Sequence, residues 1–77
     1  MIKILDVKMT GDIVSAKCLP ENNPKRTTYI EFNIKTREII SISDPEERCY
    51  AGHAVSKLCR IFRETGSLPE TAESWWV

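Results

Sequence analysis

The stretch from Asp44 to Gly66 carries the start and stop signals of one long helix, and it constrains the fold more than any other part of the sequence. Asp44 is suited to accept hydrogen bonds from the first free backbone N–H groups, and Pro45 suits the first helical position. Glu47 lies three residues after this cap, where it is expected to close a capping box. At the other end, Gly66 suits the left-handed residue that ends a helix, and Pro69 prevents the helix from continuing.

The predicted helix has an apolar side and a polar side, as expected for a helix that lies on a sheet. Its apolar stripe contains Ala51, Ala54, Val55, Leu58 and Phe62, with Cys59 and Ile61 at the flanks. Its polar side contains Cys49, His53, Ser56, Lys57, Arg60, Arg63 and Glu64. Gly52 lies near the edge of the stripe, and because a glycine within a helix is unfavourable, we expect another backbone to approach it closely.

Two alternating stretches, Met1–Met9 and Ile13–Leu19, predict a hairpin with Gly11-Asp12 as its two-residue turn. This turn fixes the register of the two strands. All three apolar pairs that it creates share one face, and the opposite face gains a pair of opposite charges. The predicted pairs are Met9 with Val14, Val7 with Ala16, Leu5 with Cys18, and Asp6 with Lys17.

Two further strands are predicted at Thr27–Asn33 and Glu38–Ser43, after a proline-bounded loop. A two-residue turn at Lys35-Thr36 and a four-residue loop at Ile34–Arg37 give the same register between them. The four-residue loop would place Arg37 in the left-handed region. The predicted pairs are Phe32 with Ile39, and Tyr29 with Ile42.

The order of these elements predicts an α+β fold in which a four-stranded antiparallel β-meander is followed by one long helix packed on the sheet (ββββα). Residues 1–77 form one domain, with the sheet in 1–43, the helix in 44–66 and a short aromatic C-terminal tail in 67–77. The helix-facing side is expected to contain Leu5, Val7, Met9, Val14, Ala16, Cys18, Ile30, Phe32 and Ile39. The second side contains Ile2, Ile4, Leu19, Tyr29, Ile40 and Ile42, which is more apolar than a solvated sheet face usually is.

The overall composition favours no particular class of partner. The chain has 11 basic and 11 acidic residues, so no net charge draws it to nucleic acid or to an anionic membrane. No apolar run approaches the ~20 residues that a membrane helix needs, and no signal-peptide pattern opens the sequence. Three cysteines, an odd number without paired spacing, predict free thiols in a cytoplasmic protein.

The sequence carries no constellation that predicts an enzyme, and no cofactor is expected. Cys49 and His53 are four residues apart on one helix face, which would suit a thiol dyad, but no third group orients the histidine. Two ligands at this spacing are also too few to predict a metal site. Thiol chemistry at these residues is therefore the third of three functional hypotheses.

The favoured hypothesis is a small non-catalytic protein-interaction module that self-associates as a homo-oligomer or binds another protein. It depends on the surplus of apolar residues on the second face and on the two adjacent tryptophans of the tail, which either fold back on the domain or contribute to an interface. The expected partner-binding residues are Tyr29, Ile40, Ile42, Trp75 and Trp76.

The second hypothesis is binding of nucleic acid through the basic side of the helix. Lys57, Arg60 and Arg63 could contact phosphates. The aromatic residues do not alternate with these basic residues, as a base-stacking platform would require. Nucleic acid is therefore a possible partner but not the favoured one, and no membrane partner is expected.

Overall fold

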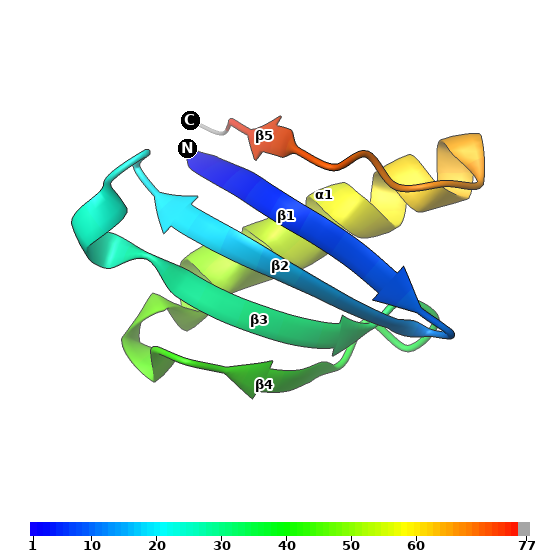
Figure 1. Cartoon of the computed structure of the whole chain (residues 1–77), viewed down its shortest axis with the longest axis horizontal. Helices are drawn as coiled ribbons and strands as arrows, with labels where there is room; N and C mark the ends of the chain where they lie inside the picture. Colours follow the sequence, from blue (N-terminus) through cyan, green and yellow to red (C-terminus); the bar gives the residue numbers. More distant parts are fainter. Residues whose placement is uncertain (76–77) are drawn as a thin grey trace.

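The structure, a computed structural model, describes residues 1–75 as two layers, a five-stranded antiparallel sheet and one helix that covers one face of it (Figure 1). The strands lie in the order β4-β3-β2-β1-β5. They span Ile2–Thr10 (β1), Ile13–Pro20 (β2), Thr28–Asn33 (β3), Ile39–Ile42 (β4) and Ala72–Ser74 (β5). The helix α1 spans Arg48–Thr65, and two 3-10 turns span Pro24–Arg26 (η1) and Pro45–Glu47 (η2). The α+β class and the strands-then-helix order are as predicted.

The fifth strand was not predicted, because it comes from the tail. Ala72–Ser74 pairs antiparallel with Ile2–Ile4, and the Val7 amide donates to the Glu70 carbonyl at 3.0 Å just beyond this pairing. The chain returns after α1 and covers the outer edge of β1 (Figure 1). A three-residue strand is too short to show alternation, so its sequence gives no strand signal.

The β1–β2 hairpin has the predicted turn, but the predicted register holds only next to it. Met9 lies opposite Val14, as expected, whereas Ile4 rather than Leu5 lies opposite Cys18. The register shifts between Leu5 and Lys8, where Asp6 has a positive φ of +52°. This β-bulge reverses the direction of the side chains in the first half of the strand.

The β3–β4 connection is the four-residue loop, and Arg37 has the expected left-handed φ, at +67°. Phe32 lies opposite Ile39, as predicted. The predicted pairing of Tyr29 with Ile42 is wrong, because a second irregularity near Ile40 shifts the register so that Ile42 lies opposite Ile30.

The helix region begins and ends at the predicted residues, with two differences. The side chain of Asp44 accepts from the Glu46 amide at 3.1 Å, but Pro45–Glu47 is a 3-10 turn, and α1 begins after it. Glu47 closes no capping box; its carboxylate binds Arg26 instead. Gly66 ends the helix with φ +79°, and its amide donates to the Phe62 carbonyl at 2.8 Å.

No close backbone approach explains the glycine within the helix. A Cβ atom added at Gly52 would meet nothing within 4 Å among the neighbours in the described part of the chain. That prediction is wrong, and the residue has open space beside it.

The core lies between α1 and one face of the sheet, and the bulge in β1 decides which residues reach it. Ile2 and Ile4 are fully buried in this core, although they were expected on the second face, while Leu5 is only partly buried. Leu19 is buried too, and Ile42 packs against the core. The helix contributes the predicted stripe, with Cys59 buried and Phe62 partly buried. The expected surplus of apolar surface on the second face is therefore largely absent.

Within residues 1–75, the only long helix is too polar to span a lipid bilayer.

Candidate functional site

The partner-binding residues expected from the sequence separate into three groups in the structure. Tyr29 and Ile40 are each 57% exposed, and Trp75 is 70% exposed. Ile42 is partly buried against the core, and Trp76 lies outside the described residues. Tyr29 and Ile40 belong to the neighbouring strands β3 and β4, whereas Trp75 follows β5 at the opposite edge of the sheet.

The free edge of β4 is the first candidate surface. Nothing lies beyond this strand in Figure 1, whereas the edge of β1 is covered by β5. Edge strands are normally blunted by lysine, proline or a twisting bulge. The sequence of β4 is Ile-Ile-Ser-Ile, with no charge and no proline. Of the three protective features, β4 therefore has the bulge alone.

Ile40 is exposed because of that bulge. Glu31 lies opposite Ser41 and Phe32 lies opposite Ile39, so Ile40 is the extra residue between the two pairs and has no partner on β3. A β-bulge of this kind leaves one residue unpaired and re-aims its side chain. The side chain of Ile40, which is more than half exposed, therefore lies beside a free strand edge.

Hydroxyl groups hold the end of β4 in place. The Tyr29 amide donates to Ser43 Oγ at 2.8 Å, and the Asp44 amide donates to Thr28 Oγ1 at 3.1 Å. The two hydroxyl oxygens of Thr28 and Ser43 are 3.1 Å apart, and Thr28 is fully buried. This network was not predicted, since serine and threonine near a strand end give no specific signal. It anchors the C-terminal end of β4 to β3.

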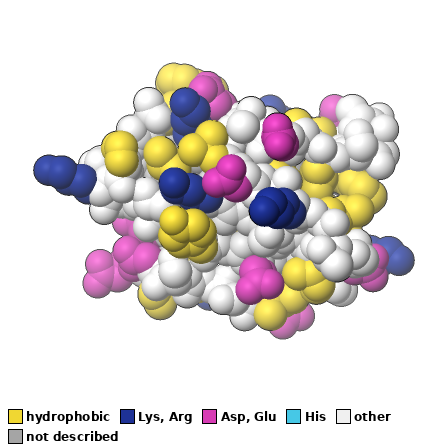
Figure 2. Space-filling model, in the orientation of Figure 1, with side chains coloured by type: hydrophobic (Ala, Val, Ile, Leu, Met, Phe, Trp, Pro, Cys, Tyr) yellow, Lys and Arg dark blue, Asp and Glu magenta, His cyan; other side chains and the backbone are white. Residues whose placement is uncertain are grey.

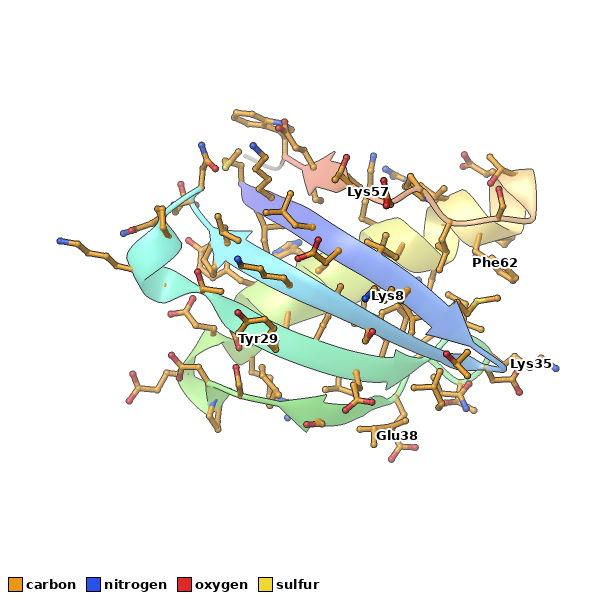
Figure 3. The ribbon with its side chains drawn as sticks, viewed as in Figure 1. Lys8, Tyr29, Lys35, Glu38, Lys57 and Phe62 are labelled. Atoms are coloured by element: carbon orange, nitrogen blue, oxygen red, sulfur yellow. The ribbon has the colours of Figure 1, made fainter. Side chains whose placement is uncertain are left out.

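A hollow of about 290 Å³ lies on the open face of the sheet, opposite the helix. Figure 3 shows Lys8 and Tyr29, which both line it, on that face. In Figure 2 the same face shows apolar, basic and acidic side chains interspersed rather than gathered into one patch. Within residues 1–75, its charged lining residues make no ion pairs. The hollow is lined in part by Asp6, Lys8, Ser15, Lys17, Tyr29 and Glu31.

The tail places its first tryptophan in solvent. The Trp75 indole Nε1 donates to Glu73 Oε2 at 3.2 Å, and this contact links neighbours of the same segment. The tail does fold back on the domain, through β5, Leu68 and Ala72, but the ring of Trp75 stays exposed. Trp75 follows β5, at the opposite edge of the sheet from β4, so it is separate from the surface formed by Tyr29 and Ile40.

The basic side of the helix is exposed but not shaped into a site. Arg60 and Arg63 are exposed and Lys57 is partly buried. Within the described part of the chain, these three cations make no ion pair. Figure 3 places Lys57 midway along α1 and Phe62 nearer its C-terminal end. A single convex helix face can bind phosphates weakly, but it gives no groove for a nucleic-acid strand.

Cys49 is exposed on the outer side of α1, whereas Cys18 and Cys59 are buried. Burial raises the pKa of the Cys18 thiol to about 12. No group of three or more His, Cys, Asp or Glu side chains within residues 1–75 is arranged to hold a metal ion.

Alkylation is expected to distinguish these thiols, because the thiolate is the reactive form and burial suppresses it. In the native protein near neutral pH, iodoacetamide should modify Cys49 while Cys18 and Cys59 react only after unfolding. Mass spectrometry of peptides after a short pulse measures this. Modification of Cys18 in the folded protein would contradict its placement in the core, and unusually fast reaction of Cys49 at low pH would favour the thiol hypothesis.

A cluster that the sequence did not indicate joins Met1 and the β2–β3 loop to the start of α1. Arg26 binds the nearly buried Glu47 through Nη2, at 3.0 Å from one carboxylate oxygen and 3.2 Å from the other. The guanidinium also lies 4.9 Å from the ring centre of Tyr50. The Tyr50 hydroxyl and the Met1 ammonium each donate to Glu21 Oε1 at 2.9 Å. The cluster fixes the β2–β3 loop against the start of α1.

This cluster makes stability depend on pH in a defined direction. Hydrogen bonds from the Met1 ammonium and from Tyr50 lower the pKa of Glu21 from its usual value of 4.5. Its contribution is therefore fully present above that value and is lost as the pH falls through the lower pKa of the folded state. We expect the urea midpoint of the wild-type chain to fall more between pH 7 and pH 3 than that of Glu21→Gln. Parallel pH profiles for the two proteins would contradict this.

Comparisons with known proteins assign no family to this chain. No protein-family model matches it, and neither the search of characterised proteins nor the search of solved structures gives a significant match.

Proposed function

We propose that this chain is a small non-catalytic protein-interaction module that binds a second copy or another protein through the free edge of β4 and the adjoining side chains of Tyr29 and Ile40. The observation that carries this proposal is the combination of an uncharged, uncovered edge strand with an unpaired Ile40 beside it. Strand addition to such an edge is a common mode of protein recognition. In that mode, backbone hydrogen bonds supply affinity and neighbouring side chains supply specificity.

The size of the surface supports a modest interaction. Tyr29 and Ile40 are each 57% exposed, and full burial of a large apolar side chain contributes about 1.5–3 kcal/mol. Part of that contribution is offset by the loss of freedom on association. The expected contact is therefore reversible and depends on concentration, as in many regulatory assemblies.

Trp75 is the second element of the expected surface. It lies at the other edge of the sheet, so it cannot contribute to the same strand-addition contact. Its 70% exposure supports a separate, smaller contact with a partner. All three cysteines are free thiols, which favours a cytoplasmic location for such a module.

Nucleic-acid binding through Lys57, Arg60 and Arg63 remains the alternative function. Its supporting observation is that these cations are unpaired within residues 1–75. We favour binding through the edge of β4 over nucleic-acid binding, because exposed cations along one side of a helix are also typical of an ordinary solvated helix. The strip carries no stacking platform in its sequence.

Photo-cross-linking tests the proposed function without assuming the identity of the partner. A benzoylphenylalanine at position 40 is expected to form discrete adducts, either with a second copy or with a defined protein. A matched probe at Met9, which is 44% exposed near the β1–β2 turn, should form few. Adducts at equal yield from both positions, or none from position 40 at high concentration, would overturn the proposal.

A further inference from the structure

We propose that two copies of this chain associate through their β4 strands, aligned antiparallel about a two-fold axis, so that the two sheets become continuous. This inference rests on the proposed function and deepens it, since it names the partner as a second copy and specifies the register of the contact. It follows from the hydrogen bonds at the two ends of β4.

The backbone groups that β4 directs away from β3 can be identified from its bonds. The Asn33 amide donates to the Glu38 carbonyl at 2.9 Å, and the Ser43 amide donates to the Tyr29 carbonyl at 2.9 Å. Residues of an antiparallel strand alternate between those that bond to the neighbouring strand and those that bond on the other side. Because Glu38 and Ser43 bond towards β3, the adjacent residues Ile39 and Ile42 direct their N–H and C=O groups to the free edge.

The bulge makes these two residues complementary to each other. It inserts Ile40 between the two registers, so Ile39 and Ile42 both face the core while their backbone groups both face outward. In an antiparallel contact between two copies, Ile39 of one copy lies opposite Ile42 of the second copy, and the reverse. The two copies are identical, so the separation between Ile39 and Ile42 along β4 is the same in both. Every outward N–H and C=O group of these two residues therefore gains a partner.

The same register brings unlike charges together beyond the strand ends. It places Arg37 beside Asp44 of the second copy. Arg37 is exposed and makes no ion pair within residues 1–75. Asp44 uses Oδ1 to cap the Glu46 amide, which leaves its other carboxylate oxygen for an arginine. Moving the register by one residue would place Glu38 near Asp44 of the second copy or lose the pair, so the charges favour the same alignment as the backbone.

The side chains near the axis also fit a second copy. The register sets Ile40 beside Ser41 of the second copy, so the two exposed isoleucines approach each other on the open face. An exposed isoleucine next to a two-fold axis is removed from water in both copies at once. No charged side chain lies within β4 to oppose this approach.

A designed disulfide tests the register. In a Cys49→Ser background, which removes the exposed native thiol, Ser41→Cys is expected to cross-link two copies on mild oxidation. The axis passes between Ile40 and Ser41, so the two Ser41 positions are offset by one residue along strands about 5 Å apart. Their Cα atoms are then about 6 Å apart, within the range that a disulfide needs. Ser56→Cys in the same background is the matched control, because Ser56 is an exposed serine on the outer side of α1. It should give at most a small fraction of the cross-linked product.

Hydrogen exchange of the wild-type chain gives a second test that needs no substitution. When nine-tenths of the chains are dimeric, the Ile39 and Ile42 amides should exchange about tenfold more slowly than in dilute samples. The amides of Lys25 and Arg26, which bond within the η1 loop, should not change. Arg37→Glu should shift the dimerisation midpoint to about tenfold higher concentration, because it replaces an attraction with a repulsion at both ends of the contact.

The possible results separate this inference from the proposed function. Dimerisation without Ser41→Cys cross-links and without protection of the Ile39 and Ile42 amides would overturn the β4–β4 register while leaving self-association intact. A chain that stays monomeric at millimolar concentration would overturn the inference outright. In that case, selective adducts of position 40 with a different protein would still support the proposed function.

Discussion

Replacing Ile4 with alanine is expected to lower the free energy of unfolding by about 2–5 kcal/mol, whereas Leu5→Ala should lower it by about 1 kcal/mol or less. Ile4 is fully buried between β1 and α1, and Leu5 is only partly buried on the other face. Large-to-small changes in a core lose the transfer free energy of the removed atoms and leave a cavity. Urea unfolding followed by circular dichroism measures both variants.

The comparison tests the β-bulge in β1 because the two residues are adjacent. In a regular strand with the register set by the Gly11-Asp12 turn, Leu5 would face the core opposite Cys18 and Ile4 would face solvent. A larger loss for Leu5→Ala than for Ile4→Ala would therefore show that the bulge at Asp6 does not form. It would also return Ile2 and Ile4 to the open face.

Replacing Phe32 with alanine is expected to cost about 3–5 kcal/mol of stability, the largest effect of any single substitution in β3. Phe32 is fully buried in the core, opposite Val14 on one side and Ile39 on the other. Tyr29 lies three residues earlier on the same strand and is 57% exposed. Tyr29→Ala should change stability by about 1 kcal/mol or less and should instead weaken association.

These two variants separate structural residues from interaction residues on one strand. Unfolding by urea reports stability, and dilution followed by light scattering reports association. The Phe32→Ala protein is compared only under conditions in which it remains folded. If Tyr29→Ala loses as much stability as Phe32→Ala and binds as well as wild type, Tyr29 belongs to the fold and not to the candidate surface.

The helix was predictable because its signals are local. Asp44 and Gly66 act on backbone groups within a few residues of themselves, so the ends of the helix region follow from side-chain chemistry alone. The polar cluster around Glu47 did not follow, because its partner Arg26 is distant in sequence and approaches only when the β2–β3 loop folds over the start of α1. A glutamate three residues after a helix cap predicts a capping box. The local sequence does not show whether a distant arginine binds that glutamate instead.

The sheet was predictable where apolar and polar residues alternate regularly along a strand. It was not predictable where a bulge reverses which residues face the core. Ile2 and Ile4 are out of phase with Val7 and Met9, and this conflict is the one signal in the sequence for the bulge at Asp6. Aspartate tolerates a left-handed conformation better than most residues, so the position suits it. The bulge at Ile40 has no comparable signal, because isoleucines occur in both phases around it.

The candidate surface was predictable in its residue types and not in its geometry. Apolar residues expected on the second face of the third and fourth strands suggested Tyr29 and Ile40, but the proposed contact depends on the backbone direction of Ile39 and Ile42. That direction follows from hydrogen bonds at Glu38 and Ser43, which only the folded chain shows. Arg37 and Asp44 were interpreted from the sequence as a loop residue and a cap residue, and their expected complementarity follows from the proposed register.

Light scattering of the reduced chain over a range of concentrations tests the central claim most directly. The wild-type mass is expected to rise from that of one chain, 8.8 kDa, towards twice that value, while Ile40→Lys stays at the mass of one chain. Met9→Lys, which adds the same charge near the β1–β2 turn, should behave as the wild type does. A wild-type mass that never changes with concentration, or one that Ile40→Lys and Met9→Lys alter equally, would contradict self-association through the free edge of β4.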